Sequence, residues 1–299
     1  MSNNIASLSE STFRSNIRHT GLPSCNIDIR TLKKLFGKLN ECCREAATIE
    51  LSKLRQGTMT TEQYEKFKND VAESYKINVE ILGKKGEYFS STSESLLDEN
   101  VLPSQLVRLT FNSEFLFKTA FNAVPMNSVK IIIDFNKATV LDFSSNPSHP
   151  TSNDSVIDVL GQTESWVDGV YKAVNDILKE CSTHRTWLHR RGIYDLFLWL
   201  FIIPLSFWNL HKLVLGFPTF FNAISGVIQV FVSIYFLLLI ILLYRAFFSY
   251  ARWVFPYIEL SSTSKTTSTR HRIFFTGLTL TLTYGLLKDL IKRIIEIIF

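Results

Sequence analysis

Hydrophobic residues recur at two different periods in the first half of the chain. Between residues 29 and 54 they follow one another at three- and four-residue steps, which predicts an amphipathic helix. The segment 60–76 repeats this period and carries Thr60 or Thr61 as its expected N-cap. A third helix is predicted over 163–182, where apolar residues again occupy one face.

Between these helices, apolar and polar residues alternate, which predicts β-strands. Residues 77–90 alternate around a Gly-Lys-Lys-Gly turn, which is typical of a hairpin. The alternating pattern returns in three later segments, 105–117, 128–145 and 155–161. Within the second of these, Asn136 and Lys137 form the expected turn of another hairpin. Helices, antiparallel strands and a closing helix together predict an α+β domain over 29–185, preceded by a loose lead-in over 1–28.

Two long apolar stretches dominate the second half of the chain. Residues 193–216 would extend about 36 Å as a helix, and a hydrocarbon core is about 30 Å thick. Pro204 is expected to kink this helix. The side chain of Lys212 is expected to extend to the far membrane interface. The next stretch carries no charge as far as Tyr244, whereas a soluble core helix of that length would show a polar stripe. We therefore predict a transmembrane hairpin within 186–260, with spans over 193–214 and 222–244.

The distribution of charge predicts how the hairpin is oriented. Residues 1–192 contain 23 Lys and Arg against 23 Asp and Glu, whereas residues 193–299 contain 9 against 4. Basic residues flank both outer sides of the hairpin and favour the cytoplasmic side. The first residues are polar and lack the apolar core of a signal peptide. We expect a multi-pass protein of the inner (cytoplasmic) membrane, with its N-terminal domain in the cytoplasm and the lipid bilayer as a partner.

Aromatic and basic residues mix in the segment 245–260, directly after the second span. This composition is typical of a chain lying at the level of lipid headgroups, where aromatic rings and guanidinium groups both find suitable surroundings. The expected membrane-interface anchors on the two sides of the hairpin are Arg190, Arg191, Arg245, Arg252, Trp253 and Tyr257.

The final segment, 261–299, opens with a polar loop and ends as a two-faced helix. Its charged residues fall within about 140° of a helical wheel. They are Lys288, Asp289, Lys292, Arg293 and Glu296. Three placements are open: flat in the interface, partly inserted, or with the charged face lining a water-filled path in an oligomer. The interfacial placement is favoured, because a third span would carry basic residues outward against the charge rule.

Recognisable catalytic signatures are absent from the sequence: it has no Gly-rich nucleotide loop, no His-Glu-x-x-His, no Gly-x-Ser-x-Gly and no Cys-x-x-Cys. Asp134 and Asp142 end neighbouring predicted strands. Two strand-end acids on an exposed face are the favoured interpretation, and a facing pair for Mg²⁺ binding or acid–base chemistry is the alternative. Lys84 and Lys85 lie in the first hairpin turn, where a solvated turn is the favoured interpretation and binding of an anionic ligand is the alternative. The cysteines and histidines lack the spacing of metal ligands, so no metal or cofactor is expected. The neutral balance of residues 1–192 also argues against nucleic acid as a partner.

The layout favours a membrane effector, in which a cytosolic sensing domain controls an oligomeric helical region that perturbs or opens the membrane. In plan it resembles the small bacterial membrane effectors that pair a cytosolic sensor with a few spans, including those of anti-phage defence. The resemblance is architectural and assigns no residue. It implies a homo-oligomer and a protein or small-molecule trigger. The alternatives are a membrane-anchored interaction protein without channel activity and a membrane-tethered enzyme that uses the Asp134 region.

Overall fold

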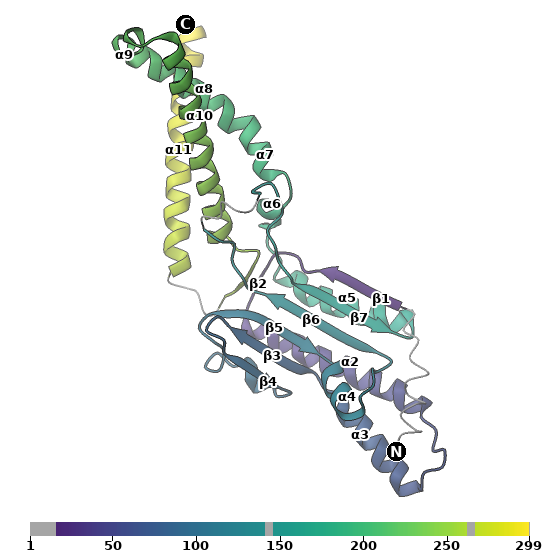
Figure 1. Ribbon diagram of the computed structural model, residues 1–299. Coiled ribbons are helices and arrows are strands. Elements are labelled where there is room, and N and C mark those ends of the chain that lie inside the picture. The colour runs from purple at the N-terminus through teal and green to yellow at the C-terminus, as the bar shows by residue number, and fades with distance from the viewer. Residues whose placement is uncertain (1–15, 141–145, 262–266, 299) are drawn as a thin grey trace. The chain divides into compact units, whose positions relative to one another are not determined.

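The computed structural model describes residues 16–140, 146–261 and 267–298 of the chain. Contacts divide the molecule into two compact units, which we call the sheet unit and the helical unit (Figure 1). The sheet unit comprises residues 1–136, 153–184 and 257–263. The helical unit comprises residues 137–152, 185–256 and 264–299. Each unit therefore contains segments that are distant in the sequence.

A six-stranded antiparallel sheet forms the centre of the sheet unit. Its strands follow the order β1-β7-β6-β5-β3-β4, and every neighbouring pair is antiparallel. Their bounds are β1 Asn16–Gly21, β3 Asn78–Gly83, β4 Tyr88–Ser91, β5 Leu106–Asn112, β6 Ser128–Asp134 and β7 Val156–Gly161. The predicted α+β class and antiparallel sheet are confirmed, and the hairpin predicted over 77–90 is the pair β3–β4.

The longest helices of the sheet unit cover one face of the sheet. Its helices are α2 Ile29–Lys53, α3 Thr61–Ser74, the 3₁₀ helix η1 Glu94–Leu97, α4 Glu114–Phe121 and α5 Glu164–Glu180. Figure 1 shows α2 and α5 against the same side of the sheet. On that side alternate strand residues such as Ile81, Phe111 and Ile131 are fully buried. This is the period of two expected of strands with one covered face.

Capping side chains explain where the first two helices begin. The Asp28 carboxylate accepts a hydrogen bond of 2.7 Å from the backbone N–H of Thr31 at the start of α2. Thr60 and Gln63 exchange side-chain-to-backbone bonds at the start of α3. Of the two expected N-caps, Thr60 is the one used, because Gln63 at the third helical position completes a capping box.

The expected loose lead-in contains two strands. β1 pairs with β7, and β2 Cys25–Ile27 pairs in parallel with β8 Ile258–Leu260. Residues 16–27 therefore belong to the sheet unit. Most residues of β1 are exposed, since it forms an edge of the sheet, so it lacks the apolar alternation that marks the other strands.

The hairpin predicted around Asn136 and Lys137 is wrong. β6 ends at Asp134 and pairs with β5 on one side and β7 on the other, so neither of its edges is left for a strand from 137–145. Asp142 lies outside the described residues. The strand predicted through 113–117 also ends early, because α4 begins at Glu114 and buries Phe117.

The helical unit consists of helices of very different lengths. They are α6 Thr186–His189, α7 Ile193–Phe197, the π-helix η2 Leu198–Ile202, α8 Ile203–Gly216, α9 Pro218–Ala223, α10 Gly226–Val254 and α11 Thr267–Ile298. Two helical stretches, Ile193–Gly216 and Gly226–Val254, are long and apolar enough to cross a membrane. Many of their side chains are exposed, such as Val227 at 68% and Tyr235 at 70%. Exposed apolar surface of this extent fits a lipid environment better than water.

The first apolar stretch changes its hydrogen-bond pattern just before Pro204. The N–H of Ile203 bonds to the carbonyl of Leu198, five residues back, as in a π-turn. Proline has no N–H and its ring crowds the preceding turn, so the helix widens there. The disturbance expected from Pro204 therefore takes the form of a π-turn.

Polar side chains within the two apolar stretches bond inside the helical unit. Gln229 Nε2 donates to the carbonyl oxygens of Phe221 at 2.7 Å and Ile224 at 3.3 Å. The Tyr244 hydroxyl donates to the carbonyl of Tyr194 at 3.0 Å. In a bilayer interior such groups must find their partners within the protein, because no water is present to supply them.

Candidate functional site

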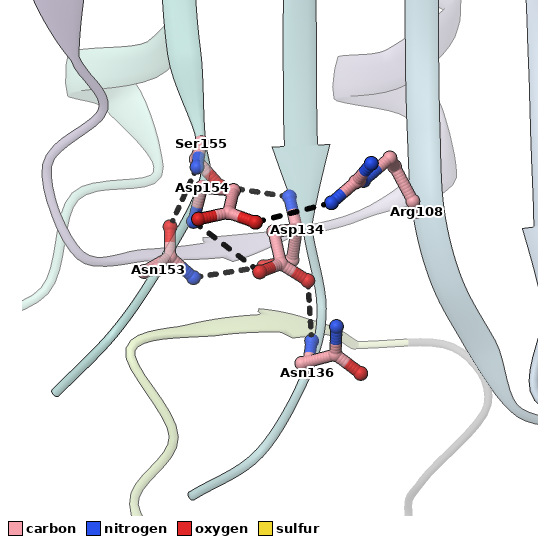
Figure 2. A network of polar contacts seen from close by, with 6 residues as sticks. All are labelled: Arg108, Asp134, Asn136, Asn153, Asp154 and Ser155. Carbon is pink, nitrogen blue, oxygen red and sulfur yellow. Dashed lines mark hydrogen bonds and ion pairs between the residues drawn. The ribbon is translucent and has the colours of Figure 1, made fainter.

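Asp134, at the end of β6, is a predicted site residue with a hydrogen-bond partner on each carboxylate oxygen. It is 4% exposed. Its Oδ1 accepts a hydrogen bond from the backbone N–H of Asn136 at 3.0 Å, and its Oδ2 accepts one from the backbone N–H of Asp154 at 3.3 Å (Figure 2). Its own N–H donates to Ser155 Oγ at 2.7 Å. Both carboxylate oxygens thus satisfy backbone donors, which is a structural use of the group.

The same network joins the place where the chain leaves the sheet unit to the place where it returns. Asn153 Nδ2 donates to the Asp134 carbonyl at 3.0 Å, and Asn153 Oδ1 accepts from the N–H of Ser155 at 3.1 Å (Figure 2). Residues 137–152 belong to the helical unit, so the chain leaves the sheet unit just after Asn136 and returns at Asn153. The network therefore fixes the two ends of this excursion to each other.

Asp154 is an acid beside Asp134, whereas the predicted partner Asp142 lies outside the described residues. Asp154 forms an ion pair of 3.1 Å with Arg108, and the two side chains are 66% and 40% exposed. An ion pair this exposed contributes little to stability. Among the described residues, no group of three or more His, Cys, Asp or Glu is placed to hold a metal ion. A signal for this network was present in the run Asn-Asp-Ser before β7, because these residue types bond to nearby backbone groups.

Lys84 and Lys85 lie where the sequence predicts, in the exposed turn between β3 and β4. The backbone N–H of Lys84 donates to the carbonyl of Gln105 at 2.9 Å, and that of Lys85 donates to Glu87 Oε2 at 3.0 Å. A carboxylate thus already occupies a backbone donor that an anionic ligand would use. The turn itself depends on Gly86, whose φ is +85°.

A buried arginine lies in the last turn of α10. Arg252 is 8% exposed, and its Nε donates to the carbonyl of Leu188 at 3.2 Å. Its Nη1 donates to the carbonyls of Pro147 at 3.2 Å and His149 at 3.1 Å, and its Cζ lies 4.7 Å from the centre of the Phe248 ring. In the described part of the chain its Nη2 has no hydrogen-bond partner. Arg252, a predicted interface anchor, is held by protein carbonyls, and its place at the headgroups stays a prediction.

His189 is buried beside this arginine, with 3% of its surface exposed. Its Nε2 lies 2.8 Å from the Phe255 carbonyl oxygen and its Nδ1 2.8 Å from Thr151 Oγ1. A carbonyl only accepts, so Nε2 carries the proton and Nδ1 accepts from the threonine hydroxyl. Burial, reinforced by the charges of Arg252 and Arg185, lowers the pKa of His189 to about 4, despite the bond to Phe255. The imidazole is therefore neutral at neutral pH.

Further hydrogen bonds fasten the excursion to the start of the first apolar stretch. Ser148 Oγ donates to Asp195 Oδ1 at 2.6 Å, and the N–H of Gly192 donates to the Ser148 carbonyl at 3.0 Å. The N–H of Thr151 donates to the His189 carbonyl at 3.3 Å. Ser148 and Thr151 are thus bonded to the base of the hairpin.

Two more guanidinium groups meet at Phe255, directly after α10. The Cζ atoms of Arg185 and Arg272 lie 6.0 and 5.8 Å from the centre of its ring. Arg272 Nε also donates to the carbonyl of Val254 at 3.3 Å. We call the set formed by these groups and their neighbours the span-base cluster; its members are Arg185, His189, Arg252, Phe255 and Arg272.

The other predicted interface anchors have varied surroundings. Arg190 and Arg191 are exposed, whereas Arg245 and Trp253 are half-buried. The Tyr257 hydroxyl donates to the carbonyl of Leu22 at 2.9 Å, within the sheet unit. A role of these residues at lipid headgroups stays a prediction.

The charged tail continues one long helix, α11. Its beginning packs on the end of α10, where the Phe247 and Phe275 rings stack 4.8 Å apart and the Tyr250 hydroxyl lies 2.8 Å from His271 Nδ1. Lys288 is exposed. The other charged side chains predicted to line a pore or interface lie outside the described residues; they are Asp289, Lys292, Arg293 and Glu296. The three placements of the tail stay predictions.

Comparison of the chain with protein-family models, with curated proteins and with solved structures finds no match in any of the three. The geometry described above joins segments to one another: Asp134 binds backbone N–H groups, Arg252 binds backbone carbonyls, and His189 links Thr151 to Phe255.

Proposed function

We propose that the protein is a membrane effector in which the sheet unit is a cytosolic sensing domain that controls the helical unit in the membrane. The observation that supports this proposal is that the chain passes repeatedly from one unit to the other. It does so at 136–137, 152–153, 184–185, 256–257 and 263–264. An anchor needs one such passage, whereas repeated passages couple a change in one unit to the other.

The tightest of these passages follows α10. Only residues 255–257 separate the end of α10 from β8, which pairs with β2. The other side of β2 reaches the end of α5, through the bridge between Cys25 and Ser182 and a 2.9 Å bond from the N–H of Asn26 to the Cys181 carbonyl. A ligand that shifts β2 against α5 would therefore pull on α10.

The return of the chain to the sheet unit also supports the proposed topology. Residue 184, before the first apolar stretch, and β8, after the second, belong to the same compact unit. Both ends of the hairpin would then lie on one side of the membrane. Basic residues flank both ends, which favours the cytoplasmic side of the inner membrane.

An effector also needs an oligomer, because two spans enclose no path by themselves. The exposed apolar surface of α10 supplies a face for other copies as well as for lipid. The tethered-enzyme alternative receives no support from Asp134, whose carboxylate oxygens are both bonded to backbone groups.

The test inserts a flexible Gly-Ser linker after Pro256, which uncouples α10 from β8 and leaves both intact. The matched control places the same linker after Gly216, between the two apolar stretches, where it interrupts no passage between the units. The wild-type protein and both insertions are reconstituted in dye-loaded liposomes and expressed in cells with a membrane-potential dye.

We expect wild type to cause leakage or depolarisation, the insertion after Pro256 to change it, and the control to leave it unaltered. Equal behaviour of the two insertions would contradict coupling through β8. Tight liposomes and a normal membrane potential with all three proteins would favour the anchor instead.

A further inference from the structure

Positive charge is concentrated in the helical unit. In the full sequence its segments contain 13 Lys and Arg against 4 Asp and Glu, whereas those of the sheet unit contain 19 against 23. The net charges are thus +9 and −4, which agree with +5 for the chain. Such an excess attracts anionic partners to the helical unit.

The surroundings of Arg252 indicate where a bound anion would balance a buried positive charge. A buried cation normally has a carboxylate beside it, because neutral partners compensate only part of its lost hydration. In the described part of the chain Arg252 has three carbonyl partners, no carboxylate and a buried Nη2 without a partner. Its hydrogen-bond partners therefore supply no negative charge to balance its own.

The neighbouring cations add to the positive field. The half-buried Arg185 and Arg272 approach the same Phe255 ring, and Arg185 and Arg252 both act on the pKa of His189. Arg185, Arg252 and Arg272 therefore gather around one short stretch of backbone at the end of α10. Asp195, the acid at the start of the first apolar stretch, is engaged by Ser148.

We propose that the span-base cluster binds the phosphate of an anionic phospholipid headgroup, an inference that rests on the hairpin crossing a membrane. Arg185 and Arg272 would contact the phosphate, and the buried Arg252 would add its charge from beneath. Guanidinium groups suit this role because their donors match phosphate oxygens in pairs.

Lipid is favoured over soluble phosphate by the surroundings of the cluster. The Phe255 ring contacts Phe275 at 5.7 Å, and the Trp253 ring lies beside Lys137 Nζ at 5.5 Å and His271 at 5.0 Å. Aromatic rings next to cations at the end of an apolar helix are typical of the headgroup level. Basic pockets between membrane helices on the cytoplasmic side bind anionic headgroups in this way.

The test uses the full-length protein in neutral detergent, titrated with phosphatidylglycerol, phosphatidylcholine or inorganic phosphate. Melting temperature and native mass spectrometry report binding. The double variant Arg185→Gln/Arg272→Gln removes two charges from the cluster, and Arg190→Gln/Arg191→Gln removes two exposed charges from the same end of the hairpin. Arg252 is left intact because its loss would remove three hydrogen bonds.

We expect phosphatidylglycerol to bind and stabilise wild type, the cluster variant to bind it at least about tenfold more weakly, and the exposed-charge variant to change by less than about threefold. Equal weakening in both variants would mean a diffuse surface potential and overturn the site. Equal binding of phosphatidylcholine, or equal stabilisation by inorganic phosphate, would overturn the choice of ligand.

Flotation with phosphatidylcholine vesicles separates this inference from the proposed function. A protein that fails to float does not insert its hairpin, and the proposed function fails with it. A protein that floats but shows no preference for phosphatidylglycerol retains the proposed function and loses only the lipid site.

Discussion

Protonation of His189 should destabilise the helical unit as the pH falls from about 6.5 to about 4. Burial beside two arginines lowers the pKa of this imidazole to about 4 in the folded protein, whereas an unperturbed histidine has a pKa of about 6.5. Between these values the unfolded chain binds a proton that the folded chain does not. The contribution of His189 is therefore fully present above about pH 6.5 and is lost as the pH falls through this window.

The magnitude follows from the difference between the two pKa values. About 2.5 units, at about 1.4 kcal/mol for each unit, correspond to a loss of roughly 3 kcal/mol by about pH 4. Two features of the structure disfavour the protonated imidazole. A proton on Nδ1 would face the Thr151 hydroxyl that now donates to it, and it would add a third positive charge to Arg252 and Arg185.

The assay follows unfolding of the full-length protein in nanodiscs by tryptophan fluorescence, at a series of pH values across this window. His189→Gln removes the titrating group, so the difference between its pH slope and that of wild type isolates His189. His184→Gln, at an exposed histidine in the sheet unit, is the control and should follow wild type. If His189→Gln loses stability with falling pH as steeply as wild type does, the reasoning is refuted.

Three substitutions test the sheet unit by chemical or thermal denaturation of the full-length protein. Phe111→Ala, in the fully buried side of β5, should lower the free energy of unfolding by about 3–5 kcal/mol, because it leaves a cavity under the helices. Tyr75→Phe removes a 2.8 Å bond to the buried Glu50 carboxylate and should cost about 1–3 kcal/mol. Asp134→Asn puts an amide N–H group against backbone donors and should cost about 1–3 kcal/mol. Equal stability of Asp134→Asn and the exposed Asp154→Asn would show that the network does not hold the excursion.

The sequence predicts correctly those helices, caps and strands that depend on residues close together in the chain. The helix over 29–54, the capping residue Thr60 and the strands around the Gly-Lys-Lys-Gly turn all follow from periodicity and turn chemistry within short windows. The apolar stretch ending near Tyr244 was equally visible, because a bilayer requires one long apolar helix whatever its neighbours are.

Long-range pairing could not be predicted in the same way. β1 pairs with β7 across the sequence from Asn16 to Gly161, and β2 pairs with β8 across an even longer separation. The span-base cluster was also missed as a set. The sequence predicts Arg252 only as an interface anchor, and Arg185 and Arg272 only as charges that flank the hairpin. Nothing in their spacing indicates that one aromatic ring joins two of them.

Under the proposed function, three of the passages between the units would carry the signal: the two ends of the excursion over 137–152 and the link from α10 to β8. The ends of the excursion are fixed by Asp134 in the sheet unit, and its residues Pro147, His149 and Thr151 are bonded to Arg252 or His189 in the helical unit. The third passage joins α10 to β8 through three residues. A sensor that reorders the ends of β6 or β2 would therefore act on one place, the base of α10. A phospholipid bound there would hold the same base, so the proposed trigger and the proposed lipid would both act on the position of a single helix end.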